Sequence, residues 1–280
     1  MKLYTFIISL ALSFSAYAQD VTIGNNTMTL KTCSHDAGAI CSLIYNGKQF
    51  LNDYDHGRQL QSASSFDGLG ESFNPTEAGS YNDGLNPSPS SSKLLSASKI
   101  GNDTLMTYTQ MAYWYKLRNQ ALSNHKLIKI VKLGFEGHPE IIEYTTIFQL
   151  PDNEYHSKAT FEVLTAYLDN SFTTFYVLDN NNVMQWLSPT PIGEQNLPIM
   201  ATTSDQLYAM GFFSPGTPQP EYPAAGYGRW KFEDTTKINN VYRISKPSGT
   251  YSFKTYVVVG SYSEVRDGLI FLKNRFKVWK

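Results

Sequence analysis

Short apolar runs separated by polar turn residues make up most of the chain. They are rich in Val, Ile, Thr, Tyr and Phe, and Gly, Asn, Asp, Ser or Pro interrupt them, a pattern typical of strands joined by turns. The runs that we predict as strands are Val21–Leu30, Ala39–Tyr45, Leu105–Tyr115, Lys126–Phe135, Ile141–Leu150, Ala159–Ala166, Leu207–Phe213, Asn240–Ser245 and Tyr251–Gly260. Asn46-Gly47 predicts a hairpin turn, because both residues accept the positive φ angles that such a turn requires. Ser263–Lys273 is the one segment that we predict as a short helix.

This spacing of strands predicts an all-β fold, a large antiparallel two-sheet sandwich with few short helices. No repeat of fixed period and no Pro- or Gly-rich linker divides the chain, so we expect a single domain over residues 19–280. Asn52–Ser92 departs from the pattern because it contains no predicted strand. Long loops in compact domains are usually functional or disordered, and the polar and aromatic content of this one favours function.

The first 18 residues have the features of a signal peptide. Lys2 supplies a positive charge, Leu3–Phe14 form an apolar core, and Ala16-Tyr17-Ala18 match a small-x-small cleavage site. A membrane-spanning helix needs about 20 apolar residues, and no such stretch follows. We therefore expect a mature chain that begins at Gln19, has no membrane anchor and is periplasmic or secreted.

The composition of the chain indicates a folded protein and disfavours some classes of binding partner. With 41% hydrophobic and 17% charged residues the chain can bury a core, which argues against disorder. A net charge of -1, with no dense basic cluster outside the C-terminal tail, disfavours nucleic acid and anionic membranes as partners. The cysteines, Cys33 and Cys41, are expected to form a disulfide after export, since the spacing of a cysteine metal site is missing.

Three segments resemble galactose-mutarotase-like domains. Pro247–Tyr256, followed by Val257–Gly260, is similar to the closing strand pair of that family; Ala37–Lys48 resembles its opening hairpin, and Leu207–Pro215 a later strand. The resemblance implies a β-supersandwich, a fold that also occurs in sugar epimerases and in domains of polysaccharide lyases and glycoside hydrolases. It further implies a carbohydrate ligand in a cleft on the concave face of a sheet, which Asn52–Ser92 would cover.

The candidate chemistry gathers in that long segment. Asp55, His56, Arg58 and Gln61 place acid, imidazole, guanidinium and amide groups close together, and Gly57 lets the chain bend sharply. Mutarotases use a His acid, a Glu base and an Arg that orients the sugar, and by its position Arg58 resembles that Arg. His56 is the candidate proton shuttle. A buried network that fixes the loop to the sandwich is the competing interpretation.

Two carboxylates and several aromatic rings complete the candidate site. Glu71 and Glu77 could form the acid pair that glycoside hydrolysis needs, or could be ordinary solvated groups. Tyr113, Tyr115 and Trp230 could stack on sugar rings, although aromatic residues are also common in strands for packing reasons alone.

Other chemistries find little support in the sequence. His125, His138 and His156 flank predicted strands, but no pair has the spacing of metal ligands on a helix. We see no Gly-rich phosphate loop, no nucleophile elbow and no Cys–His pair. We therefore expect no metal and no cofactor, and we disfavour nucleotide use and acyl transfer.

The leading hypothesis is thus an exported carbohydrate-directed protein, in its catalytic form a glycan-processing enzyme of epimerase, lyase or hydrolase type. The alternative is a non-catalytic envelope module that binds glycan or protein. A structural envelope subunit is a third possibility. The sugar, its linkage, a bound calcium ion and the oligomeric state do not follow from the sequence.

Overall fold

The computed structural model describes residues 19–232 and 234–278. The expected signal peptide, residues 1–18, lies outside the described residues. Within the described ranges, no helix has the length and apolar character needed to cross a membrane.

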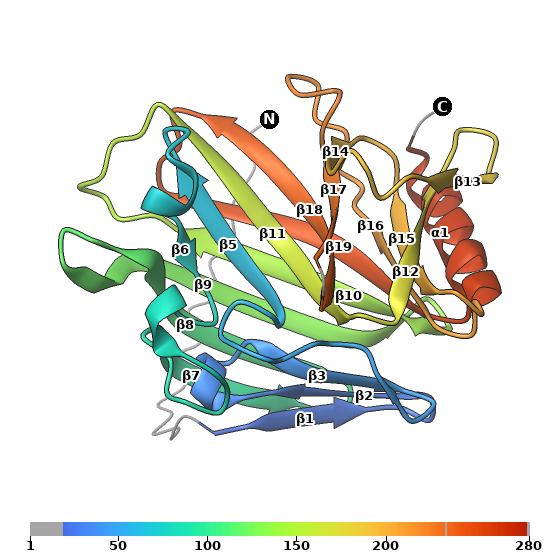
Figure 1. Ribbon diagram of the computed structural model, residues 1–280, viewed down its shortest axis with the longest axis horizontal. Coiled ribbons are helices and arrows are strands. Elements are labelled where there is room, and N and C mark those ends of the chain that lie inside the picture. Colours follow the sequence, from blue (N-terminus) through green and yellow to red (C-terminus); the bar gives the residue numbers. More distant parts are fainter. Residues whose placement is uncertain (1–18, 233, 279–280) are drawn as a thin grey trace, which may run out of the picture.

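Two large antiparallel sheets are packed face to face (Figure 1). The first runs in the order β1 (Val21–Gly24), β2 (Met28–Thr32), β3 (Ile40–Tyr45), β5 (Leu60–Phe66), β11 (Lys158–Asp169), β18 (Thr235–Ser245), β17 (Tyr227–Lys231) and β14 (Gly193–Gln195). The second runs in the order β7 (Lys93–Ile100), β8 (Thr104–Leu117), β9 (Gln120–Phe135), β10 (His138–Gln149), β19 (Thr250–Gly260), β16 (Ala209–Phe213), β15 (Ile199–Thr203), β12 (Phe172–Leu178) and β13 (Met184–Leu187). The predicted all-β fold class is confirmed.

Short elements connect the sheets. β4 (Lys48–Gln49) pairs with β3 across the predicted Asn46-Gly47 turn, where both residues have positive φ. β6 (Pro75–Thr76) pairs with β5 of the first sheet and with β8 of the second, and so joins the two sheets. The predicted disulfide is present, with a Cα–Cα distance of 5.8 Å between Cys33 and Cys41. It closes the turn that contains the 3₁₀ helix η1 (Ser34–Asp36).

Apolar side chains are buried on both faces of the second sheet. In β19, Val257 and Val259 point into the core between the sheets, whereas Val258 points outward. The outward side is covered by α1 (Tyr262–Phe276), which contacts β10, β12, β16 and β19 (Figure 1). Burial of Leu269 and Leu272 on α1 contributes roughly 1.5–3 kcal/mol per side chain. The predicted C-terminal helix is therefore confirmed.

The helix begins at a cap that the sequence encodes. The Ser261 hydroxyl accepts a hydrogen bond from the Glu264 backbone N–H, and the Glu264 carboxylate accepts one from Ser261 N at 2.7 Å. This reciprocal capping box satisfies two backbone donors that would otherwise lack partners.

The prediction that Asn52–Ser92 contains no strand is wrong. β5 lies inside it, in the interior of the first sheet, and β6 and the 3₁₀ helices η2 (Gly70–Phe73) and η3 (Tyr81–Asp83) follow. The sequence of β5 is Leu-Gln-Ser-Ala-Ser-Ser-Phe, in which small polar residues take the place of the usual β-branched ones. Its pairing with β11, a tertiary contact, outweighs the weak local preference.

Candidate functional site

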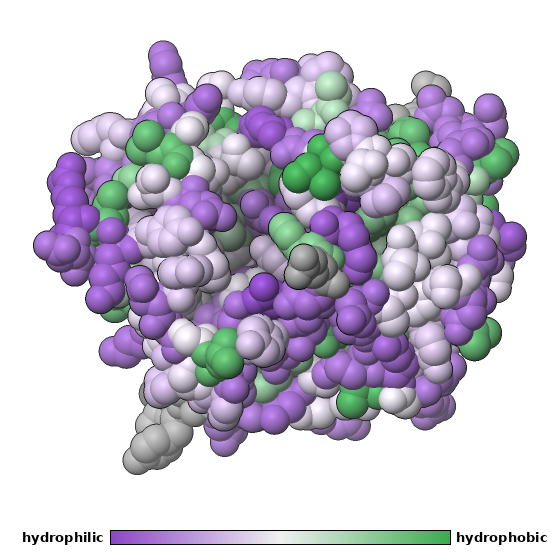
Figure 2. All heavy atoms as spheres, viewed as in Figure 1, coloured by the Kyte–Doolittle hydropathy of each residue, from purple (hydrophilic) through white to green (hydrophobic). Residues whose placement is uncertain are grey.

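A pocket of about 350 Å³ opens on the face of the first sheet that points away from the core. Its floor comes from β5, β11 and β18, and its walls from the connections after β4, β5, β6 and β17 together with the end of β8. Figure 2 looks onto this face and shows a hollow near its centre. Small-molecule sites span roughly 300–1,000 Å³, so the pocket has the size for a small ligand.

A β-bulge in β11 directs two polar side chains into this pocket. The pairing register of β11 shifts after Glu162 against both of its neighbours, β5 and β18. Val163 and Leu164, which are adjacent in sequence, are consequently both buried in the core. Glu162 and Thr165 both line the pocket, although strict alternation would put them on opposite faces.

Glu162 and Lys237 form an ion pair on the pocket floor. Lys237 Nζ lies 3.0 Å from Glu162 Oε2, and the Thr165 hydroxyl donates to the same oxygen at 2.8 Å. Burial alone would raise the pKa of Glu162, but the Lys237 charge and the Thr165 hydrogen bond lower it below its ordinary value. Burial also opposes the charge on Lys237, yet the Glu162 carboxylate raises the pKa of that lysine. Both groups are therefore charged at neutral pH.

Arg58 and Asp55 face each other at the rim of the pocket. Their side chains form an ion pair, and Asp55 Oδ1 accepts a hydrogen bond of 2.9 Å from the Gly57 backbone N–H. Arg58 Nη2 also lies 3.8 Å from Asp234 Oδ2. The planar guanidinium has five N–H donors, so Arg58 can hold a ligand oxygen while it remains fixed by these carboxylates.

Aromatic rings form the pocket walls. Trp114 comes from the end of β8, and Tyr81 and Phe232 come from connections. Tyr81 meets Trp114 edge-on, with 6.0 Å between the ring centroids. A Cβ at Gly57 would lie only 2.7 Å from Trp114 Cη2, so the glycine makes room for the indole ring. The walls thus offer flat apolar surfaces above a charged floor.

Four of the residues predicted from the sequence lie together in this lining: Asp55, Arg58, Gln61 and Glu71. Gln61 lies on β5, where its Oε1 accepts a hydrogen bond of 3.1 Å from Ala78 N. Glu71 lies on η2 and is exposed.

None of the three predicted stacking residues belongs to the lining of this pocket. Tyr113 is buried, and burial raises the pKa of its hydroxyl to about 12. Tyr115 packs against Tyr81, with 5.5 Å between centroids. The Trp230 ring lies 4.6 Å from Lys237 Nζ, a cation–π contact that supports the pocket floor from one side.

His56 and Glu77 lie in the interior, apart from the pocket lining. The His56 side chain is 1% exposed, and its Nδ1 is 3.1 Å from Asp36 Oδ1. Burial alone would lower the pKa of His56, but the Asp36 carboxylate raises it. Glu77 is fully buried with Lys129, and its second oxygen accepts from Ser62 N at 3.0 Å. Both side chains therefore fix the 52–92 segment to the sandwich, and Glu77 is buried rather than solvated.

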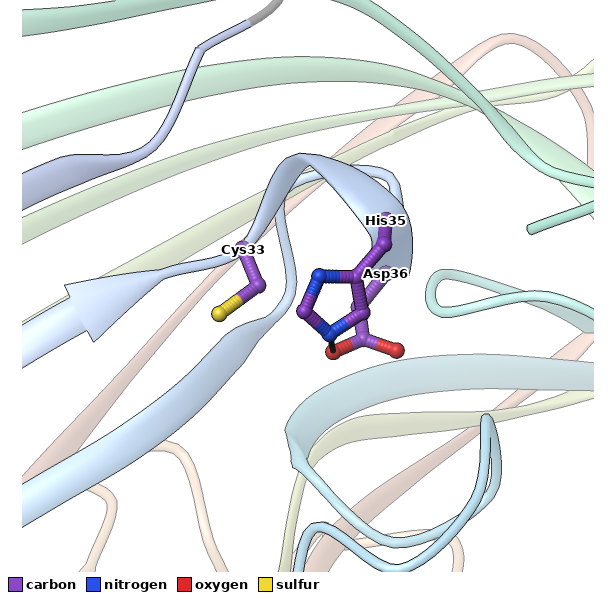
Figure 3. A group of neighbouring side chains, drawn as sticks. All are labelled: Cys33, His35 and Asp36. Carbon is purple, nitrogen blue, oxygen red and sulfur yellow. Dashed lines mark ion pairs between the residues drawn. The ribbon is translucent and has the colours of Figure 1, made fainter. Parts of the chain in front are cut away.

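The turn closed by the disulfide supplies the partner of His56. Figure 3 shows Cys33, His35 and Asp36 together, with the ion pair of 3.2 Å between His35 Nε2 and Asp36 Oδ2. Asp36 is fully buried between His35 and His56. The three residues of Figure 3 lie close enough to suggest a metal cluster, but the Cys33 sulfur is bonded to Cys41. The group is a structural network.

Glu162, Thr165 and Lys237 were missed by the reasoning from sequence. Glu162 stands between Phe161 and Val163 in a predicted strand, so alternation alone indicates that it points outward. The sequence gives no sign of the bulge that brings Thr165 to the same face, nor of the pairing that places Lys237 beside it.

Comparisons with known proteins agree with this architecture. A galactose mutarotase related enzyme from Lactobacillus acidophilus superposes with a TM-score of 0.50 and 9% identity, over 87% of this chain and 98% of its own. A protein from Synechocystis sp. PCC 6803 superposes with a TM-score of 0.50 and 10% identity, over 92% of this chain and 100% of its own. A protein in glycosyl hydrolase family 38 from Enterococcus faecalis superposes with a TM-score of 0.56 and 11% identity. The match covers 92% of this chain but 32% of that protein.

No protein-family model and no curated protein matches the chain by sequence. Identities of 9–11% to the solved structures show the fold and nothing finer. The chain has the galactose-mutarotase-like β-supersandwich fold.

Proposed function

We propose that this is an exported carbohydrate-directed protein that binds a saccharide in the pocket on the outer face of the first sheet. The observation that carries the proposal is the charged pair Glu162–Lys237 on the floor of a small pocket with Trp114 in its wall. Structural neighbours named as a galactose mutarotase related enzyme and a glycosyl hydrolase family 38 protein support a sugar as the ligand.

The chemistry of the lining matches that of a sugar ring. Ring hydroxyls need donors and acceptors on one side, which Arg58, Glu162 and Lys237 supply as charged groups, and hydrogen bonds to charged groups are the stronger kind. The C–H face of the ring needs a flat apolar surface, which Trp114 supplies. Charged groups already held in place by Thr165 and by one another lose little freedom on binding.

Turnover of the bound sugar would involve Glu162. Its lowered pKa keeps the carboxylate ionised at neutral pH, the state that a general base requires. Lys237 stabilises negative charge near the same point, and Glu71 on the rim is the candidate second carboxyl group. The non-catalytic alternative is favoured by the positions of His56 and Glu77, whose polar atoms are committed to interior partners.

Export rests on two features. Residues 1–18 have the pattern of a signal peptide, and Cys33–Cys41 is a disulfide of the kind that persists in oxidising compartments. We propose a periplasmic or secreted location, which cell fractionation of the full chain tests directly.

The binding proposal is tested by calorimetry with neutral and acidic mono- and oligosaccharides. We expect a saccharide that binds the native protein, and Glu162→Gln should weaken that binding at least about 10-fold, because a charged hydrogen-bond acceptor is worth roughly 1.5–3 kcal/mol. Assays for new reducing ends, unsaturated uronates and anomer interconversion, run on the same saccharide, distinguish an enzyme from a binding module.

Glu143→Gln is the matched control. Glu143 on β10 lies 3.1 Å from Lys254 on β19, an ion pair between adjacent strands like Glu162–Lys237 but on the second sheet. The control should bind saccharide as the native protein does. If no saccharide binds, or if both variants bind as the native protein does, the proposed pocket is wrong.

A further inference from the structure

A second cluster of chemically active side chains lies outside the saccharide pocket. His125 near the start of β9 and two residues of the β10–β11 connection, Glu154 and His156, converge on one point. His125 Nε2 lies 2.8 Å from Glu154 Oε2, and His156 Nε2 lies 3.3 Å from the same oxygen. Their three ligand-type atoms all lie within 4.8 Å of one another.

We propose that His125, Glu154 and His156 form a binding site for a divalent transition metal ion, Zn²⁺ in the first place. Zn²⁺ is bound at about 2.0–2.2 Å by imidazole nitrogen and carboxylate oxygen in tetrahedral geometry. Ligand atoms on such a tetrahedron lie about 3.3 Å apart. Of the two distances to Glu154 Oε2, that from His156 matches this spacing and that from His125 is about half an ångström shorter, so small side-chain rotations would suffice to admit the ion.

Asp67 fixes the orientation of His156. Asp67 Oδ2 lies 2.8 Å from His156 Nδ1, while its Oδ1 accepts hydrogen bonds from Ser157 N at 2.7 Å and Ser157 Oγ at 2.9 Å. A carboxylate that accepts the Nδ1 proton leaves Nε2 as the metal-binding atom, the arrangement found behind most histidine ligands. Asp67 is therefore a positioning residue.

Aromatic packing holds both imidazoles in place. The Phe66 ring lies 4.9 Å from the His125 ring and 4.3 Å from the His156 ring, and Phe73 packs edge-on against both. The two histidine side chains are 3% and 6% exposed, against 23% for Glu154. Because the two imidazole side chains are already held in place, they lose little conformational entropy when an ion binds.

One side of the cluster is open. A cavity of about 280 Å³ is lined by Glu154, His156, Tyr113 and Arg118 among others. Three protein ligands with a free position toward a cavity are typical of zinc sites that bind water or a small ligand, whereas purely structural sites have four protein ligands. The cavity therefore provides the fourth position.

The test uses tag-free native protein, treated with chelator and dialysed, and titrated with ZnCl₂ alone by calorimetry. We expect one equivalent to bind with a Kd below about 1 µM, and the Co²⁺-loaded protein to show visible absorption bands of four-coordinate Co²⁺. Glu154→Gln and His156→Gln should each weaken Zn²⁺ binding at least 10-fold, and Asp67→Asn should weaken it by about 10–100-fold.

His138→Gln is the matched control, because His138 Nδ1 also lies 2.8 Å from a carboxylate, that of Glu140, and packs on the Phe271 ring. It should bind Zn²⁺ as the native protein does. Circular dichroism identifies any variant that fails to fold, and the partly exposed Glu154 provides the variant least affected by that problem. Absence of stoichiometric binding, or equal binding by the Glu154→Gln and native proteins, would overturn the proposal. Because the site is separate from the saccharide pocket, Zn²⁺ binding by Glu162→Gln protein should remain unchanged.

Discussion

At the scale of single residues, the pocket depends on charged groups whose charge is maintained by their neighbours. Glu162 is half-buried, yet the Lys237 ammonium and the Thr165 hydroxyl lower its pKa against the effect of burial. Asp53, in the connection that also carries Asp55 and Arg58, shows the opposite balance. Burial, with a smaller effect from the Asp36 charge, raises the pKa of Asp53 from 3.8 to about 6.

Asp53 should therefore make stability depend on pH. The folded protein binds this proton more tightly than the unfolded chain, so the free energy of unfolding should fall as pH rises from about 4 to about 6. Asp53→Asn should remove this dependence, because an amide does not titrate. Its Oδ1 can still accept the hydrogen bonds from Gln59 and Asn86, so the local structure should be kept. Melting temperatures at pH 4 and pH 7 measure the effect.

The Asp53→Asn variant should be more stable than the native protein at pH 7 and similar to it at pH 4. Asp103→Asn, at an exposed turn, is the control and should keep the native pH profile. Equal pH profiles for Asp53→Asn and the native protein would show that Asp53 does not titrate in this range.

At the residue scale, contact between two side chains can be predicted from the sequence where they lie close together along the chain. Asp55 and Arg58 lie three positions apart and meet at the pocket rim, because a sharp turn at Gly57 keeps local neighbours together. Glu162 and Lys237 are far apart in sequence, and their contact depends on strand pairing. No local pattern identifies such a pair.

At the scale of elements, a buried ion pair attaches the 52–92 segment to the second sheet. Lys129 on β9 pairs with Glu77, and its Nζ also donates to the Gly38 carbonyl oxygen at 2.7 Å. Both side chains are fully buried. Burial disfavours the charged form of Lys129 and lowers its pKa, whereas the Glu77 carboxylate opposes this effect. The ion pair therefore depends on the close contact between the two side chains.

Lys129→Met should consequently lower the free energy of unfolding by about 3–5 kcal/mol, because it leaves the buried Glu77 carboxylate without a positive charge beside it. The double variant Glu77→Gln/Lys129→Met should recover part of this loss, since the amide oxygen of Gln can still accept from Ser62 N. Urea unfolding at pH 7 measures both changes. A loss under about 1 kcal/mol in the single variant would contradict the assigned role of the pair.

Element prediction worked where the side-chain pattern is strong. β8, β9, β10, β11 and β19 overlap predicted strands that are rich in β-branched and aromatic residues. Val21–Leu30 was predicted as one strand, but a turn at Asn25–Thr27 divides it into β1 and β2. β7, β12, β13, β14, β15 and β17 were not predicted, and several of these are short or begin beside Pro and Gly. Their strand state is set by sheet neighbours rather than by their own sequence.

At the scale of the whole molecule, the two candidate sites lie on different parts of one β framework. The proposed saccharide pocket uses the outward face of β5, β11 and β18. The proposed metal site lies near the start of β9 and the β10–β11 connection. Phe66 at the end of β5 packs on the histidines of the metal site, while Gln61 on the same strand lines the pocket. One strand therefore supports both sites with its two faces.

The most direct test of the central claim is an NMR titration that follows the indole N–H signals, assigned by Trp→Phe variants. Trp114 lines the pocket, whereas Trp186 on β13 is 62% exposed and outside it, so one chain carries both reporter and control. On addition of a saccharide that calorimetry identifies as a ligand, the Trp114 signal should shift with saturation while the Trp186 signal stays in place. A saccharide that binds without moving the Trp114 signal, or that moves only the Trp186 signal, would contradict the account.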